Sequence, residues 1–256
     1  MKTLSKILLS LTAMCAAALQ AQDSAPYSHR QSLSLFTEYS NTSSHIILGV
    51  SQNRRLAAVG ATYSRRLLHT RYVDWHYDLE ARPFTLIQEP VAGVTLLSIS
   101  PPLVFSPSSS PLGLGFPAGT PIQRNCTTGT VVYVDPATTH SPAVTYTYSE
   151  ICGRRWTYAA GLSPLGQRFN FAPRHRLQPF VVGNAGFMVA TRSLPSINAR
   201  SFNFTFEFGA GLQLYRDHQH SWSAEYRIHH LSNAYTAKDN PGIDSQILKL
   251  TYTFGK

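Results

Sequence analysis

Hydrophobic and polar residues alternate with a period of two along most of the chain. In residues 202–215, phenylalanine and leucine fall on even positions, and asparagine, threonine, glutamate, glutamine and glycine fall on odd positions. The same alternation recurs in 73–80, 222–228 and 248–254. This period is typical of β-strands whose two faces meet different surroundings.

Extended over the chain, the pattern predicts eight strands. They are 31–41, 54–66, 71–86, 155–163, 176–191, 202–215, 221–232 and 246–254. An even number of strands places both termini at the periplasmic end of a bacterial barrel. The short connections 67–70 and 216–220 suit that end, whereas 164–175 is longer than usual there. The remaining connections, 42–53, 87–154, 192–201 and 233–245, are then extracellular.

Two architectures explain such alternation, a soluble β-sandwich and a transmembrane β-barrel. The predicted strands are long for a sandwich, and their polar positions include several ionisable groups. Aromatic residues gather near strand ends, as they do at membrane interfaces. No segment after the amino-terminal region reaches 18 consecutive apolar residues, so helical membrane spans are not expected. We predict an all-β fold, an eight-stranded antiparallel transmembrane β-barrel, with the sandwich as the alternative.

Residues 87–154 are predicted to form a long extracellular loop. The segment is rich in proline and serine, and it contains Cys126 and Cys152. Two cysteines in an oxidising compartment most simply form one disulfide, which would pin the loop. Within it, 130–134 and 144–148 could pair as a small hairpin above the barrel.

The amino terminus has the pattern of a secretory signal peptide. Lys2 and Lys6 precede an apolar stretch over 7–19 that is too short to span a bilayer, and Ala21 is a small residue suited to cleavage. We therefore expect residues 1–21 to be removed.

A lipoprotein signal that uses Cys15 is the alternative, but Met14 stands where a small residue is preferred. The mature domain is then 22–256, with 20 basic and 13 acidic residues. This positive charge favours an anionic partner such as a lipopolysaccharide surface. Nucleic acid is not expected as a partner, because lysine and arginine form no cluster.

No metal or other cofactor is expected. Neither cysteine of the mature chain has a second cysteine at the short spacing of a zinc site. The pairs His218/His220 and His229/His230 also lack partner ligands at matching spacings. The sequence does not address the oligomeric state.

Three residues near the outer ends of the last two strands form a candidate catalytic site. His230 and Ser232 are two positions apart on the predicted strand 221–232, so they project from the face otherwise given to lipid. Asp244 has the same outward parity on the next strand. Polar residues on a lipid-facing wall are costly unless they lie near the interface or serve a function.

These residue types are those of a serine esterase. An imidazole takes the proton of the serine hydroxyl, and a carboxylate orients the imidazole and stabilises its charged form. Asn233 adds an amide donor beside the nucleophile, suited to a developing oxyanion. The alternative is that His230 and Ser232 are simply polar rim residues. His229 has the opposite parity and is expected in the lumen.

Several motifs resemble the lipid A 3-O-deacylase (PagL) family of outer-membrane barrels. The most specific is the run 226–234, YRIHHLSNA, followed by NPGID at 240–244. Supporting motifs are GLSPLG at 161–166, QPF at 178–180 with GNAG at 183–186, and NFTFEFGAG at 203–211. The likeness covers 155–254 well and 30–86 loosely.

The resemblance implies an enzyme of the bacterial outer membrane that hydrolyses the 3-position acyl ester of lipid A. It assigns His230 as the base, Ser232 as the nucleophile, Asn233 as an oxyanion contributor and Asp244 as the acidic residue. The family's best-known members have glutamate at this last position. The alternative from another class is a non-catalytic barrel with a structural or adhesive role through 87–154.

Overall fold

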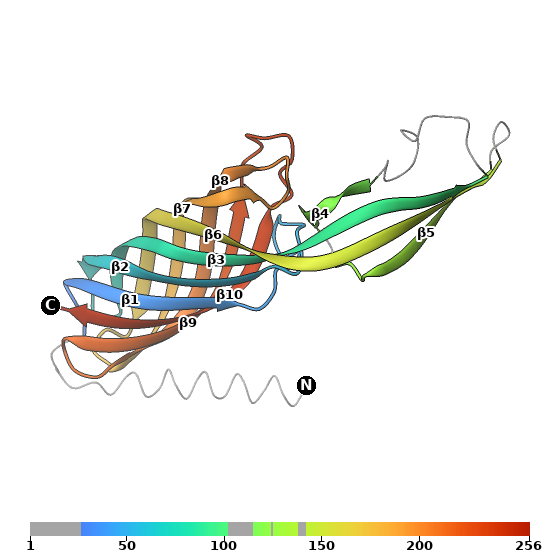
Figure 1. Cartoon of the computed structure of the whole chain (residues 1–256). Helices are drawn as coiled ribbons and strands as arrows, with labels where there is room; N and C mark the ends of the chain where they lie inside the picture. The colour runs from blue at the N-terminus through green and yellow to red at the C-terminus, as the bar shows by residue number, and fades with distance from the viewer. Residues whose placement is uncertain (1–26, 102–114, 124, 138–141) are drawn as a thin grey trace, which may run out of the picture.

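The computed structural model describes residues 27–101, 115–123, 125–137 and 142–256, and their regular structure is β-strand (Figure 1). The predicted signal peptide at 1–21 lies outside the described residues. No helix that is long and apolar enough to cross a bilayer occurs within these ranges.

Eight antiparallel strands close into a ring. They follow the order β1, β2, β3, β6, β7, β8, β9 and β10, and β1 pairs with β10 to close it. Their bounds are β1 Gln31–Ser40, β2 Arg55–His69, β3 Val73–Ser100, β6 Val144–Phe171, β7 Leu177–Leu194, β8 Arg200–Tyr215, β9 His220–Ser232 and β10 Ile243–Gly255. The predicted eight-stranded barrel is therefore confirmed.

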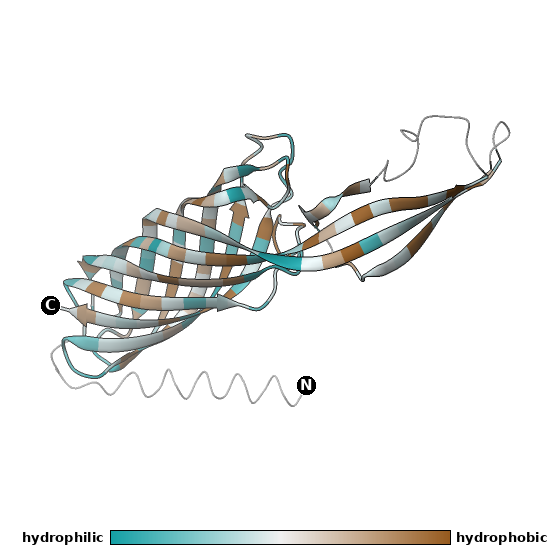
Figure 2. Ribbon diagram, in the orientation of Figure 1, coloured by the Kyte–Doolittle hydropathy of each residue, from teal (hydrophilic) through white to brown (hydrophobic). Residues whose placement is uncertain are grey.

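Hydrophobic and hydrophilic residues alternate along the strands of the ring (Figure 2), and the apolar side chains are exposed on the outside whereas the polar ones are buried inside. On β8, Phe204 and Phe208 are 46% and 48% exposed, whereas Asn203 and Glu207 are 1% and 3% exposed. A soluble sandwich buries its apolar face, so this inverted arrangement excludes the sandwich alternative. It is the pattern of strands that face lipid outside and a polar lumen inside.

An ion-pair network fills the lumen. Arg82 contacts Glu38 at 2.8 Å from its Nε atom, and Arg227 Nη1 lies 2.7 Å from Glu207 Oε2. Lys249 adds a third cation, 3.4 Å from Glu38. The three central carboxylates, those of Glu38, Glu80 and Glu207, lie close together. Because each is neutralised by arginine or lysine, the cluster is a structural core of the barrel.

Two strands continue far beyond the ring and form an arm. The ladder between β3 and β6 runs without a loop from Val73↔Phe171 to Ser100↔Thr145. β4 (Gly115–Pro121) pairs with the outer part of β3, and β5 (Gly129–Asp135) pairs with the outer part of β6 (Figure 1). The arm has a small apolar core of its own, which contains Val94, Val144, Tyr146 and Tyr148.

The arm corrects the predicted strand boundaries. The sequence placed strand ends at 86 and 155, but β3 continues to Ser100 and β6 begins at Val144. The predicted hairpin over 130–134 and 144–148 corresponds to the β5–β6 pairing. At the other end, β6 reaches Phe171, so the connection predicted at 164–175 is a short turn. Proline and serine in 87–154 concealed the alternation that these strands share with the barrel.

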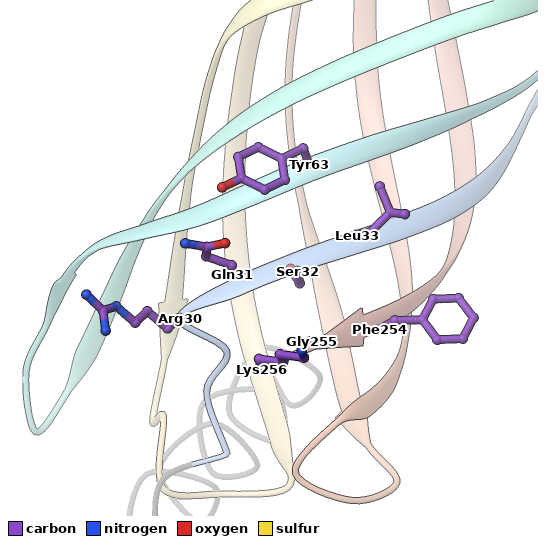
Figure 3. Close-up of a pocket in the computed structure, with 8 residues that line it drawn as sticks. All are labelled: Arg30, Gln31, Ser32, Leu33, Tyr63, Phe254, Gly255 and Lys256. Atoms are coloured by element: carbon purple, nitrogen blue, oxygen red, sulfur yellow. The ribbon is translucent and has the colours of Figure 1, made fainter.

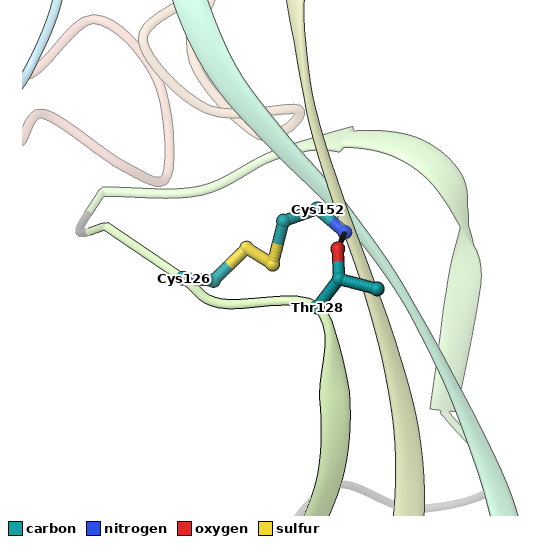
Figure 4. Close-up of a disulfide and its surroundings, with 3 residues drawn as sticks. All are labelled: Cys126, Thr128 and Cys152. Carbon is teal, nitrogen blue, oxygen red and sulfur yellow. Dashed lines mark hydrogen bonds between the residues drawn. A yellow bond between two sulfur atoms is a disulfide. The ribbon is translucent and has the colours of Figure 1, made fainter.

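A disulfide joins Cys126 to Cys152, as predicted (Figure 4). Cys152 lies on β6 within the arm, and its backbone N–H donates to Thr128 Oγ1 at 3.0 Å. Both contacts fasten the segment before β5 to β6. The disulfide therefore holds the edge of the arm against its central strands.

Candidate active site

His230 and Asp244 are directly opposite each other on neighbouring strands. The β9–β10 register pairs the two residues, and both have the outward parity of Tyr226 and Leu248. His230 Nδ1 lies 2.5 Å from Asp244 Oδ1. The carboxylate therefore accepts a hydrogen bond from Nδ1–H, which leaves Nε2 as the nitrogen that can take a proton.

The second carboxylate oxygen of Asp244 is held by backbone amides. Its Oδ2 accepts from the N–H groups of four consecutive residues, 46–49, at 3.1, 2.6, 3.0 and 2.9 Å. The side chain is fully buried. Four donors around one oxygen compensate the loss of water and favour the ionised carboxylate. Asp244 therefore presents a fixed negative charge to His230.

The donors come from the loop between β1 and β2, which is fastened to the start of β10. Ser44 N–H donates to the backbone oxygen of Asp244 at 3.1 Å, and Val50 N–H donates to the oxygen of Pro241 at 2.7 Å. Glycine is required at position 49, because a Cβ atom there would lie 2.5 Å from the backbone nitrogen of Asp244. The backbone of the loop at Gly49 thus packs directly against the backbone of Asp244, with no room for a side chain between them.

Aromatic packing and a tight turn shield the imidazole. The ring of Phe206 on β8 lies 4.9 Å from that of His230, centroid to centroid. Gly242 adopts φ +60°, and a Cβ atom there would approach His230 Cε1 to 3.1 Å. His230 is consequently only 4% exposed although it projects from the lipid-facing wall.

Ser232 follows His230 on the same face at the end of β9. Residues two apart on a strand are separated by about 6.6 Å along it. Ser232 is partly exposed, and within the described residues its hydroxyl makes no hydrogen bond, to His230 or to any other group. The structure therefore joins His230 and Asp244 directly, whereas Ser232 lies two positions further along β9 without a hydrogen bond to either of them. Catalytic hydrogen bonds are often long without substrate and tighten when it binds.

Asn233 is held within the loop that follows β9. Its Nδ2 donates to the backbone oxygen of Asp239 at 2.7 Å, and its backbone N–H donates to Asn240 Oδ1 at 2.9 Å. One amide hydrogen remains beyond the contact with Asp239. These hydrogen bonds show that Asn233 stabilises the loop that follows Ser232.

An apolar groove begins directly below His230 on the outer wall. It has a volume of about 480 Å³. Its lining residues are Val181, Val182, Phe208, Gly209, Ala210, Tyr226 and Ile228. Ile228 is the outward neighbour of His230 on β9, and Ala210 lies between larger side chains on β8. The groove therefore begins one outward residue away from His230, on the side toward the middle of the membrane.

Sequence reasoning missed the contributions of Phe206 and of the 46–49 amides. A backbone donor leaves no residue-type signal, and 42–53 showed only that it was a loop. Gly49 was the one available hint, because glycine allows close backbone approach.

The fold and the position of this site define the class of protein. A closed antiparallel barrel with an apolar exterior and a polar lumen belongs to the outer membrane of bacteria. The model of the family "Lipid A 3-O-deacylase (PagL)" matches residues 131–253. This segment contains β9 and nearly all of β10, and the match confirms the resemblance stated from the motifs.

Solved structures similar to this chain include other outer-membrane proteins. The outer membrane enzyme PagL is 13% identical with a TM-score of 0.49, over 87% of this chain and 99% of that one. Neisserial surface protein A is 10% identical with a TM-score of 0.40, over 88% and 97% of the two chains. LpxR from Salmonella typhimurium is 7% identical with a TM-score of 0.25, over 88% and 100%. No curated protein matches the chain significantly.

Proposed function

We propose that this protein is a serine esterase that removes the acyl chain ester-linked at the 3-position of lipid A. The observation that carries the proposal is the hydrogen bond between His230 and a buried Asp244 on the lipid-facing wall. The family match supports lipid A deacylase activity, and the residue roles and the serine mechanism are our assignment.

The proposed reaction has two halves. His230 Nε2 takes the proton of Ser232 Oγ as this oxygen attacks the ester carbonyl, and Asp244 stabilises the imidazolium. The tetrahedral intermediate collapses to an acyl-serine, and the sugar hydroxyl leaves with the proton from His230. Water then attacks the acyl-serine in the same manner and releases the fatty acid. The free amide hydrogen of Asn233 would stabilise the oxyanion.

The groove below His230 suits the acyl chain of this substrate. Its walls are apolar, and it lies on the outside of the barrel, where acyl chains of the outer leaflet already pack. A lipid A molecule could therefore bring its ester to Ser232 without leaving the membrane. In this orientation the sugar would lie at the rim and the acyl chain below it.

Mass spectrometry of lipid A from expressing cells tests the proposal. The full-length wild-type chain should produce lipid A that lacks one 3-hydroxyacyl chain, and Ser232→Ala should leave lipid A unmodified. Ser223→Ala is the matched control, because Ser223 lies on the same strand but faces the lumen. Equal lipid A masses with the wild-type chain and Ser232→Ala would exclude the proposed reaction.

Labelling with a fluorophosphonate probe tests the nucleophile itself. The wild-type protein and Ser223→Ala should react, and Ser232→Ala should not. Heat-modifiable migration on gels would verify that each variant is a folded barrel. Labelling of Ser232→Ala at the wild-type level would overturn the assignment of the nucleophile while leaving deacylation to be explained by another residue.

The alternative of a non-catalytic adhesive barrel is less well supported. The family match spans the strands that carry the candidate site, whereas the first part of the arm lies outside it. The alternative predicts that deletion of the arm abolishes function and that Ser232→Ala does not.

A further inference from the structure

A second feature of the outer wall lies at the opposite, periplasmic end of the barrel. Here Phe254 on β10, Leu33 on β1 and Tyr63 on β2 are register partners and form one row across three strands. All three side chains are exposed on the lipid-facing side. Since this end carries the short turns, such as the one between β2 and β3, the row lies at the level of the inner leaflet.

A basic and polar row follows immediately toward the periplasm. Gln31 pairs with Arg65 in the β1–β2 register, and it exchanges backbone hydrogen bonds with Lys256 on the other side. Arg30 adjoins this row. Successive outward residues on a strand are about 6.6 Å apart, so three cations lie one step below three apolar side chains.

The two rows border a pocket of about 510 Å³ (Figure 3). Its floor is formed by Ser32 and Gly255, which are register partners, and its rim includes Arg30 and Lys256. Gly255 cannot be enlarged, because a Cβ atom would lie 2.0 Å from the ring of His29. His29 is buried on the lumen side of the closure between β1 and β10, and the hollow lies along the outer side of this closure.

The cations of the rim are available for an external anion. Among the described residues, no side-chain carboxylate forms a salt bridge with Arg30 or Lys256 of the rim, or with Arg65 of the adjoining row. Asp217, in the neighbouring β8–β9 turn, is bound by His220 at 2.9 Å. On the opposite wall, the apolar row of Leu177, Leu214 and Trp222 ends beside Arg176 and Arg216, and the turn there also carries the carboxylate of Asp217.

We propose that this pocket binds one anionic glycerophospholipid of the inner leaflet, with its phosphate at the cationic rim and an acyl chain along the apolar row. The basic row and the apolar row are spaced to match a phospholipid, because its phosphate and its first methylene groups lie at adjacent depths in the membrane. The charges complement the phosphate group. The pocket is at the far end of the barrel from His230, so the lipid is a ligand and not a substrate of the site above.

Native mass spectrometry of the full-length barrel, titrated in detergent with phosphatidylglycerol, tests the proposal. The wild-type protein should retain one lipid. Each rim charge near a phosphate contributes about fivefold in affinity, so the double variant Arg30→Gln/Lys256→Gln should bind about 25-fold more weakly. Arg216→Gln is the matched control, an exposed arginine at the same end of the barrel, and should bind as the wild type does.

Three further measurements distinguish a phospholipid site from the alternatives. Phosphatidylethanolamine, which is zwitterionic, should bind more weakly than phosphatidylglycerol. Inorganic phosphate should not displace the lipid at equal concentration, and displacement would identify a free-phosphate site and overturn the proposal. Equal losses in the double variant and in Arg216→Gln would also overturn it. Lipid A deacylation should be unchanged in every variant, which separates this test from that of the proposed function.

Discussion

Adjacent histidines on β9 have opposite surroundings. His229 faces the lumen, is 2% exposed, and has its Nε2 3.6 Å from Glu207 Oε1, too far for a hydrogen bond. His230 faces lipid and contacts Asp244 at 2.5 Å. Both rings lie beside a carboxylate, but the lumen carboxylate is shared with Arg82 and Arg227, whereas that of Asp244 is left to one imidazole.

The difference shows how one strand serves two purposes. In the lumen, the carboxylates of Glu38, Glu80 and Glu207 each contact arginine or lysine, so these charges stabilise the barrel. At the outer rim, uncharged backbone amides hold the carboxylate of Asp244. They stabilise its negative charge, and His230 is the ionisable side chain that contacts it. Because side chains alternate along β9, His229 lies in the stabilising network of the lumen and the next residue, His230, lies in the candidate site.

The largest contrast is expected between the two histidines. His230→Ala should reduce lipid A deacylation by on the order of 10⁴-fold, because the serine hydroxyl loses its base. His229→Ala should retain activity within a few-fold when equal amounts of folded barrel are compared. Deacylation assays with purified lipid A in detergent would measure both. If the two substitutions cost the same, the division between lumen and rim is wrong.

Substitution of Asp244 should affect mainly catalysis, whereas substitution of Glu207 should affect mainly stability. Asp244→Asn should lower the turnover by on the order of 10³-fold and leave the barrel folded, because the imidazole loses its orienting charge. Glu207→Gln removes a partner from two buried arginines and should lower the free energy of unfolding by about 3–5 kcal/mol. Turnover and denaturant midpoints, measured on both variants, would reveal the crossed pattern. A stability loss in Asp244→Asn as large as that in Glu207→Gln would contradict it.

A smaller effect is expected from the loop that holds Asp244. Gly49→Ala places a methyl group within 2.5 Å of backbone, so the 46–49 amides must move away from the carboxylate. We expect a loss of about 10- to 100-fold in turnover with little change in affinity for substrate, as for a displaced supporting group. Gly183→Ala is the control, because a Cβ atom there meets its nearest neighbour at 3.8 Å. Activity of Gly49→Ala equal to that of Gly183→Ala would remove the loop from the catalytic apparatus.

The smallest effect on deacylation is expected from the arm. The double substitution Cys126→Ser/Cys152→Ser frees the edge of the arm but touches nothing on β9 or β10. Lipid A deacylation should remain within twofold of wild type, while limited proteolysis should cut the segment before β5 sooner. A large loss of activity in this variant would show that the arm helps to bind the substrate.

Alternation was enough to predict the barrel, and parity alone placed His230, Ser232 and Asp244 on one face. Strand length was predicted less well, because proline-rich composition in 87–154 hides strands that pair in the arm. The donors to Asp244 were beyond prediction, since backbone amides of a distant loop carry no side-chain signature. Which residues share a face is set by their spacing along one strand, so it can be read from the sequence. The contact of residues 46–49 with Asp244 depends on how two distant loops pack together.

The arm meets the barrel without a joint. β3 and β6 pass from the wall into the arm as unbroken strands, and their ladder extends from the periplasmic turn to Ser100. A pull along the arm is therefore shared by many hydrogen bonds loaded together, so the arm acts as a strut and not as a hinge. The strut is anchored in the wall across the ring from β9 and β10. The segment after β4 also contacts the β1–β2 loop, where Gln52 N–H donates to the backbone oxygen of Gln123 at 3.0 Å, so a load on the arm would reach the loop that holds Asp244.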